Sequence, residues 1–131
     1  MIGVDTNILV RFVMQDDPAQ TRIAERFLTS LTPDAPGHVS MVTLMELVWV
    51  LTETYGATRV ELANALGALL ETKSLVVEQA GSVDRALLVF KAGKADLADA
   101  LILELDREAG CRATMTFDKA AVKQVGMKLL T

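Results

Sequence analysis

The sequence predicts an α/β fold in which a parallel sheet is covered by helices on both faces. Short strand-like runs alternate with longer segments of helical periodicity along the chain, and this alternation is typical of parallel sheets. Ala, Leu and Val supply most of the 51% hydrophobic content, while aromatic residues make up only 5%, which favours a helix-rich protein over a β-sandwich. With 131 residues, the chain is expected to form a single domain over residues 1–131 with a proper core.

The chain is expected to open with one strand and two helices. Residues 1–4 are the expected buried strand, and residues 5–14 the helix or helical turn that follows it. Pro18 suits the first turn of the next helix, because a proline there loses no helical hydrogen bond. Two prolines and a glycine predict a loop over residues 32–37. Helical spacing predicts one apolar face on the second helix, made of Ile23, Phe27, Leu28 and Leu31.

The middle of the chain is expected to contain a second strand and two helices. The strand covers residues 38–40 and leads into an apolar helix over residues 42–55, which Gly56 ends. Thr58 is the expected cap of the following helix, with Glu61 three residues later as in a capping box. The apolar stripe of that helix is expected to consist of Leu62, Leu66, Leu69 and Leu70.

A short strand over residues 74–77 is expected to precede two further helices. The first of these covers residues 82–92 and ends at Gly93. The second is capped by Asp96 and ends at Gly110. The inward residues of the first are expected to be Val83, Leu87 and Phe90. The remaining elements are a strand over 113–117, a helix over 118–125 and a last strand over 126–130.

Glu46 is the acidic residue that the sequence makes hardest to explain as ordinary surface. It is the only charged residue between Asp34 and Glu53, and its helical neighbours three and four residues away include no cation. We therefore expect it to be buried. A buried, ionised carboxylate without partners costs on the order of several kcal/mol, so such a group is usually paired, protonated or bound to a metal.

Other acids follow strands or begin helices. Asp5 and Asp118 each follow a predicted strand, at the edge where parallel sheets carry their functional sites. Asp99 lies in the first turn of a helix that Asp96 caps. Each could be simply a helix cap or a charge that offsets the helix dipole. Taken together with Glu46, however, these acids can converge on one pocket.

Such a pocket would suit a hard divalent cation. Carboxylate oxygens are ligands that Mg²⁺ or Mn²⁺ prefers. One histidine, His38, and one cysteine, Cys111, cannot furnish a zinc set. The net charge of −4 argues against nucleic-acid binding only weakly, because a bound cation neutralises an acidic cluster. A carboxylate-held cation of this kind is suited to cutting a phosphodiester.

The cellular setting expected from the sequence is the cytoplasm. A single cysteine excludes an internal disulfide and fits a reducing compartment. The longest apolar run, residues 41–51, is shorter than the roughly 20 residues of a membrane span. The first residues read as a strand without a basic region or cleavage site, so no signal peptide is expected.

Four segments of the chain resemble the motifs of a known family. They are MIGVDTNILVRFV (1–13), HVSMVTLMELVWVL (38–51), KADLADALILELDREAGC (94–111) and ATMTFD (113–118). In order and spacing they resemble the four motifs of PIN-domain ribonucleases, and more specifically the VapC toxins of toxin–antitoxin pairs. The resemblance covers essentially the whole chain and implies a three-layer α/β/α sandwich with a central, mainly parallel sheet.

The resemblance also implies which residues form the site. Asp5, Glu46, Asp99 and Asp118 correspond to the acidic quartet that binds Mg²⁺ or Mn²⁺ in this family, and none of the four is missing. Of these, Asp5 and Asp99 would hold the cation most directly. Polar residues near the site, which could equally be caps or turn residues, are Thr6, Asn7, Ser40 and Thr116. Asp96 is expected to be a helix cap that neighbours the site and can hydrogen-bond there.

The expected function is that of a metal-dependent endoribonuclease, the toxin of a type II toxin–antitoxin system. The resemblance implies a homodimer and a cognate antitoxin that lays a helix in an apolar groove. Candidate groove residues, which could equally be ordinary core, are Phe12, Val13, Met14, Phe27 and Trp49. Candidate RNA contacts at the rim of the site are Arg11, Lys91, Lys94 and Lys119.

Two other functions are compatible with parts of the sequence. A Mg²⁺-dependent phosphatase could use Asp5 as its nucleophile, but no second aspartate stands two residues later as a general acid. A non-catalytic PIN-like interaction module would use the acids only as structural residues. The presence of all four carboxylates argues against that module.

Overall fold

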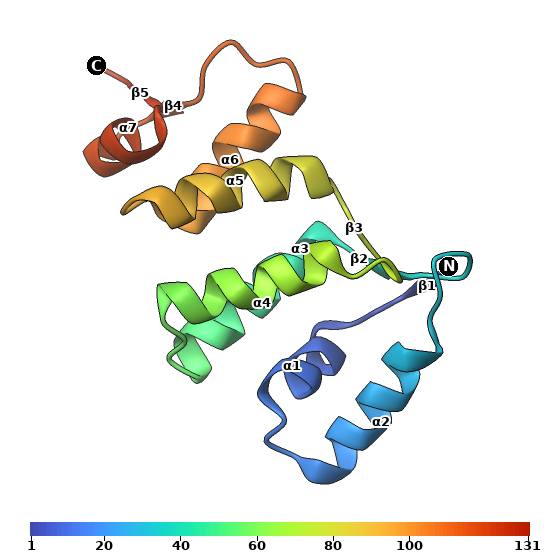
Figure 1. Cartoon of the computed structure of the whole chain (residues 1–131). Helices are drawn as coiled ribbons and strands as arrows, with labels where there is room; N and C mark the ends of the chain where they lie inside the picture. Colours follow the sequence, from blue (N-terminus) through green and yellow to red (C-terminus); the bar gives the residue numbers. More distant parts are fainter. The chain divides into compact units, whose positions relative to one another are not determined.

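Parallel strands form both sheets of the protein. The computed structural model describes residues 1–131 (Figure 1). The chain divides into two compact units, Met1–Glu78 and Gln79–Thr131. The first unit contains β1 (Ile2–Gly3), β2 (Gly37–Val39) and β3 (Leu75–Val77), which lie side by side in the order β1-β2-β3. All are parallel, with Gly37 opposite both Ile2 and Leu75. The predicted α/β class, a parallel sheet flanked by helices, is confirmed.

Four α-helices of the first unit connect and flank these strands. They are α1 (Thr6–Met14), α2 (Pro18–Ser30), α3 (Met41–Trp49) and α4 (Arg59–Glu71). The predicted helix over residues 42–55 is α-helical only to Trp49 and then continues as a π-helical turn, η1 (Val50–Thr54). Gly56, with φ of 63°, follows the end of that turn. The predicted capping box is present: Thr58 and Glu61 satisfy each other's backbone N–H groups.

The core of the first unit consists of aliphatic side chains from the sheet and the helices around it. Leu9 of α1, Val39 of β2 and Leu47 of α3 are completely buried. From α4, Leu62, Leu66 and Leu69 are buried as predicted, whereas Leu70 is only partly covered. Burial of this kind is the main stabilising term for such a unit.

The predicted apolar face of α2 is wrong in part. Ile23 is 64% exposed, and Phe27 and Leu28 are half-buried. Instead, α2 packs against α1 through its smaller residues, and Thr21 and Ala24 are its buried positions. The small side chains let the two helices approach each other, which turns the bulkier side chains toward the edges of the contact.

The second unit is built around a pair of packed helices, α5 (Ala80–Ala92) and α6 (Leu97–Glu108). Val83, Leu87 and Phe90 of α5 are buried, as predicted. The chain continues through β4 (Met115–Thr116), α7 (Lys119–Val125) and β5 (Lys128–Leu129), and β4 pairs with β5 in parallel. No helix in the structure combines the length and the hydrophobicity that crossing a membrane would require.

Candidate functional site

Asp5 lies just beyond the end of β1, as predicted, and is the N-cap of α1. Its Oδ1 accepts a hydrogen bond of 2.7 Å from the backbone N–H of Thr6. Ser40 follows the neighbouring strand β2 and caps α3, with its Oγ accepting from the N–H of Thr43 at 3.2 Å. Because β1 and β2 are adjacent and parallel, Asp5 and Ser40 lie at the same edge of the sheet. Asn7, in the first turn of α1, is exposed.

Thr6 carries the one buried side-chain polar atom that lacks a hydrogen-bond partner in the structure. The residue is only 5% exposed, and its Oγ1 has no hydrogen-bond partner. Leaving a buried hydroxyl unsatisfied costs about 1–3 kcal/mol, and an ordered water usually prevents that cost. The region beside Asp5 therefore contains a polar atom suited to a hydrated group.

Glu78 is a strand-end acid that the sequence analysis missed. It directly follows β3, its N–H donates to the carbonyl of Val39 at 2.9 Å, and its Oε2 accepts from the N–H of Met41 at 2.5 Å. Each strand of this sheet is thus followed by a polar residue: Asp5, Ser40 or Glu78. The signal was available, since an acid directly after an apolar run is the same pattern that singled out Asp5.

Glu46 is exposed, so the prediction that it is buried is wrong. The buried face of α3 contains Leu44 and Leu47. Glu46 lies on another face of the helix together with Val42 and Trp49, which are 79% and 62% exposed. These positions recur at a spacing of four and three residues, which places them in one stripe. The assignment of Glu46 to the metal site stays a prediction from the family resemblance, because the desolvation argument for it no longer applies.

Three carboxylates influence one another in the second unit. Asp96 caps α6, with Oδ1 accepting from the N–H of Asp99 at 3.0 Å, so its prediction as a cap is confirmed. Burial raises the pKa of Asp99, and the negative charges of Asp96 and Asp118 raise it further. A cation near these groups would relieve their repulsion.

Asp118 combines two roles at the end of β4. It is the N-cap of α7, and its Oδ1 accepts from the N–H of Ala120 at 2.8 Å. Its own N–H donates to the Oγ1 of Thr116 at 3.0 Å. The hydroxyl of Thr116 thereby fixes the backbone from which the Asp118 carboxylate extends.

The four predicted ligands are divided between the units. Asp5 and Glu46 belong to Met1–Glu78, and Asp99 and Asp118 belong to Gln79–Thr131. Within neither unit do three or more Asp, Glu, His or Cys side chains lie close enough together to hold a metal ion. The donor chemistry suits Mg²⁺ or Mn²⁺, since every predicted ligand offers carboxylate oxygen. The quartet as a set stays a prediction.

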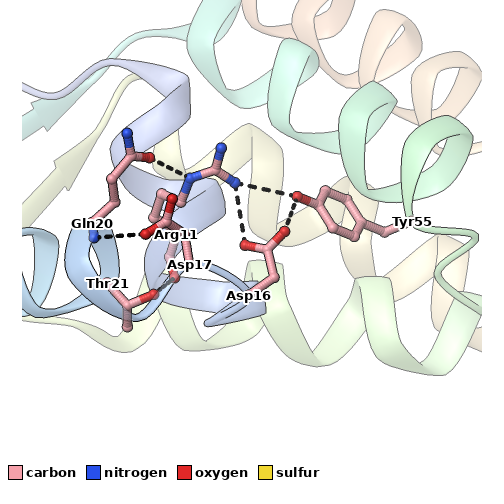
Figure 2. A network of polar contacts seen from close by, with 6 residues as sticks. All are labelled: Arg11, Asp16, Asp17, Gln20, Thr21 and Tyr55. Atoms are coloured by element: carbon pink, nitrogen blue, oxygen red, sulfur yellow. Dashed lines mark hydrogen bonds and ion pairs between the residues drawn. The ribbon is translucent and has the colours of Figure 1, made fainter.

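Arg11, a predicted RNA contact, is engaged in an internal network (Figure 2). Its Nε donates to Gln20 Oε1 at 2.6 Å, and its Nη1 lies 3.2 Å from Asp16 Oδ1 and 3.3 Å from the hydroxyl of Tyr55. That hydroxyl in turn donates to Asp16 Oδ2 at 2.6 Å. Much of the guanidinium is thus used in holding α1 to its neighbours. The other predicted contacts, Lys91, Lys94 and Lys119, are exposed.

Two cavities of the first unit contain some of the predicted groove residues. A mainly apolar groove of about 650 Å³ is lined by Phe12 and Val13 of α1, Leu28 of α2 and Leu69 of α4. Phe27 lines a different cavity, of about 620 Å³. The other two candidates, Met14 and Trp49, line neither.

A family model described as "PIN domain" matches residues 2–126, which is nearly the whole chain and includes all four predicted ligands. No curated protein matches the sequence.

Proposed function

The chain belongs to the PIN-domain family, and on that premise we propose that it is a metal-dependent endoribonuclease, the toxin of a type II toxin–antitoxin system. Most members of this family are metal-dependent nucleases. The observation that carries the proposal is the family match over residues 2–126, within which all four expected acidic positions are carboxylates. Because the match spans both units, we also propose that residues 1–131 act as one domain.

The proposed site holds Mg²⁺ or Mn²⁺ through Asp5 and Asp99, and Glu46 and Asp118 complete it. A divalent cation, when bound, supplies charge stabilisation at the phosphodiester and makes water a better nucleophile. Three of these acids lie in or at the first turns of helices. Backbone hydrogen bonds hold the carboxylates of Asp5 and Asp118 at their caps, and the cap Asp96 holds the backbone of Asp99. Such fixed carboxylates need little reorganisation to receive a cation.

Two features of the residues fit a hydrated cation. Burial raises the pKa of Asp99, the negative charges of Asp96 and Asp118 raise it further, and a positive charge would offset that repulsion. The unsatisfied Oγ1 of Thr6 lies in the residue next to Asp5, where it can bond to water. Mg²⁺ in particular keeps several of its waters when proteins bind it.

The apolar groove between α1, α2 and α4 supports the proposed antitoxin partner. Its lining by Phe12, Val13, Leu28 and Leu69 and its volume of about 650 Å³ suit the apolar face of a helix. The homodimer, like the antitoxin, is proposed from the family resemblance. Phe12→Asp should then abolish capture of a partner protein encoded next to this chain, while Ile23→Asp, on the other side of α2, should not.

Cleavage of RNA by the purified protein tests the proposed function. We expect cleavage that requires Mg²⁺ or Mn²⁺. Asp5→Asn or Asp99→Asn should reduce the rate of cleavage by about 100-fold or more. Mutation of residues that only hydrogen-bond to metal ligands can already reduce activity by up to about 100-fold. Asp84→Asn is the matched control, because Asp84 is an exposed acid on α5 outside the proposed site.

Calorimetric titration with Mn²⁺ separates the proposal from its alternative. Weaker Mn²⁺ binding by the Asp5 and Asp99 variants, but not by the Asp84 control, would support the metal site directly. Undiminished cleavage by Asp5→Asn, or a wild-type protein that neither binds the cation nor cuts RNA, would contradict the ribonuclease. The second result would favour a non-catalytic interaction module.

A further inference from the structure

The cavity that contains Phe27 lies between α1 and α2 and has a volume of about 620 Å³, within the usual range for small-ligand sites. It is distinct from the apolar groove described above. Phe27 and Leu28 are consecutive residues of α2, but Phe27 lines this cavity and Leu28 lines the groove. The two sides of α2 therefore face different spaces.

The cavity begins beside the proposed catalytic edge. Asn7, one of its lining residues, stands two residues after Asp5 in the first turn of α1. Ile8 and Arg11 continue the same wall along α1. A molecule bound here would therefore extend along α1 from the Asp5 end of that helix.

The walls combine flat apolar surface with amide groups. Phe27, Ile8 and Ile23 supply the apolar side, and Ile23 is 64% exposed. Asn7 and Gln20 supply the amides. The exposed Ile23 thus lies in the same wall as an aromatic ring and two amides, and such a mixed lining suits a flat ligand with polar edges.

The Gln20 side chain is held in one orientation. Its Oε1 accepts from Arg11 Nε at 2.6 Å, and its backbone N–H donates to Asp17 Oδ1 at 3.0 Å. Figure 2 shows its amide nitrogen pointing away from Arg11. Because the oxygen is engaged by Arg11, the amide can address a ligand through its N–H groups.

We propose that this cavity is a subsite for one unstacked nucleobase of the RNA, next to the phosphodiester that is cut. This inference rests on the proposed ribonuclease function. Proteins recognise single-stranded RNA by stacking bases on aromatic side chains and by bonding to base edges, and Phe27, Asn7 and Gln20 supply those groups. The groove on the other side of α2 also contains two amides, Gln15 and Asn64, and an aromatic ring, Phe12. Its lining is mainly apolar, however, and it suits a protein helix better.

Variants on α2 can test the subsite without touching the proposed catalytic acids. Ile23→Ala removes exposed apolar wall, and Phe27→Ala removes the stacking surface. Gln20→Glu keeps an oxygen for Arg11 but loses the amide N–H donors. Leu28→Ala is the matched control, since it truncates the residue beside Phe27 on the opposite side of α2. Thermal unfolding identifies any variant that fails to fold, and the exposed Ile23 keeps the test valid if Phe27→Ala is unstable.

The measurement is cleavage of a randomised single-stranded RNA library, with the ends of all products sequenced. We expect the wild type to prefer certain bases at one position beside the cut. Ile23→Ala and Phe27→Ala should weaken that preference by about tenfold, within the range of one good base contact. Gln20→Glu should change which base is preferred, and Leu28→Ala should keep the wild-type profile. The same variants can be combined with Asp5→Asn, and their binding of the preferred substrate measured. Ile23→Ala and Phe27→Ala should weaken that binding, and Leu28→Ala should not.

Three outcomes would overturn the subsite. Ile23→Ala and Gln20→Glu with the wild-type cleavage profile would show that no base is read here. A change in oligomeric state or partner capture with that profile unchanged would assign the cavity to a protein interface. A wild type that cuts no RNA with any cation would remove the proposed function itself and the subsite with it, a failure distinct from the other two.

Discussion

The carboxylate of Glu78, at the end of β3, accepts a hydrogen bond of 2.5 Å from the backbone N–H of Met41, the first residue of α3. The first N–H groups of a helix have no partner inside the helix, so Glu78 supplies one from 37 residues away. The side chain thereby connects the sheet to the helix that carries Glu46.

Removing that bond should destabilise the first unit. Glu78→Ala is expected to lower the free energy of unfolding by about 1 kcal/mol, a typical value for a lost helix cap. Glu78→Gln should lose less, because its amide oxygen can still accept from Met41. Urea denaturation measures both effects, with Glu71→Ala as the control at an exposed glutamate of α4. Equal stability of Glu78→Ala and Glu71→Ala would contradict a capping role.

A second acid holds the helices of the other unit together. Glu104 of α6 is only 6% exposed, and it accepts from Arg85 Nε at 3.1 Å and from Arg107 Nη1 at 3.0 Å. Removing both arginines would leave a buried carboxylate without a partner, whereas removing Glu104 leaves two half-exposed arginines that water can solvate. The two kinds of change are therefore not equivalent.

We expect the double variant Arg85→Ala/Arg107→Ala to lose about 3 kcal/mol of unfolding free energy, the lower end for a broken buried pair. Glu104→Met, which replaces the charge by an apolar chain of similar length, should lose clearly less. Chemical denaturation of the two variants and of Arg112→Ala, an exposed arginine, gives the comparison. A Glu104→Met protein that is the less stable of the two would reverse this interpretation.

Local signals in the sequence sufficed for several of the helix caps of this protein. Asp96, Asp118 and the Thr58–Glu61 capping box act as their sequence neighbourhoods predict, because a cap depends on residues two or three positions apart. The alternation of short strands and helices likewise predicted the parallel pairing, since each pair of parallel strands needs a crossover connection.

Features that depend on distant packing could not be predicted in this way. The run around Glu46 is apolar on every side, so the sequence alone does not tell which face of α3 the core covers. Ile23 has helical spacing with Phe27, yet α2 packs through Thr21 and Ala24. The partner of Glu78 is far away in the chain. In each case the contact is set by which other element lies nearby.

The network around Tyr55 predicts a contribution to stability that is lost at both low and high pH. The hydrogen bond from Tyr55, together with Arg11, lowers the pKa of Asp16, and the same bond raises the pKa of Tyr55. A carboxyl whose pKa is lowered by folding stabilises the fold at pH values above its ordinary, unfolded-state pKa. This contribution is lost as the pH falls through the pKa of the folded state. A phenol whose pKa is raised contributes below its ordinary value of about 10, and loses the contribution as pH rises above it.

Comparison of the wild type with Tyr55→Phe measures this network. The midpoint of thermal unfolding should be higher in the wild type at neutral pH, and the difference should shrink below about pH 4 and above about pH 10, where the ordinary pKa values of aspartate and tyrosine lie. Arg26→Ala, an exposed arginine of α2, is the control, and its difference from the wild type should show no such limits. A Tyr55→Phe difference that is independent of pH would exclude a role for these ionisations.

Cation binding should appear as a gain in stability that depends on Asp99. Its raised pKa means that its ionised form is disfavoured in the fold, so Asp99→Asn should be at least as stable as the wild type without metal. At a Mn²⁺ concentration about 100 times the dissociation constant, the wild type should gain about 2.7 kcal/mol of unfolding free energy. The variant should gain clearly less, because it lacks a proposed ligand.

Thermal unfolding with and without Mn²⁺ measures these gains, and Asp84→Asn should respond as the wild type does. Asp99→Asn is thus expected to preserve or raise stability without metal and to reduce the stabilisation by Mn²⁺. This combination distinguishes a metal ligand from a structural acid. If Asp99 were merely structural, its substitution would lower the stability of the protein and would not alter the effect of Mn²⁺. Substitution of an acid that is held among like charges to bind a cation should instead leave the stability of the metal-free protein intact. The same substitution should remove the stabilisation by Mn²⁺. Equal stabilisation of Asp99→Asn and the wild type by Mn²⁺ would therefore remove Asp99 from the proposed site.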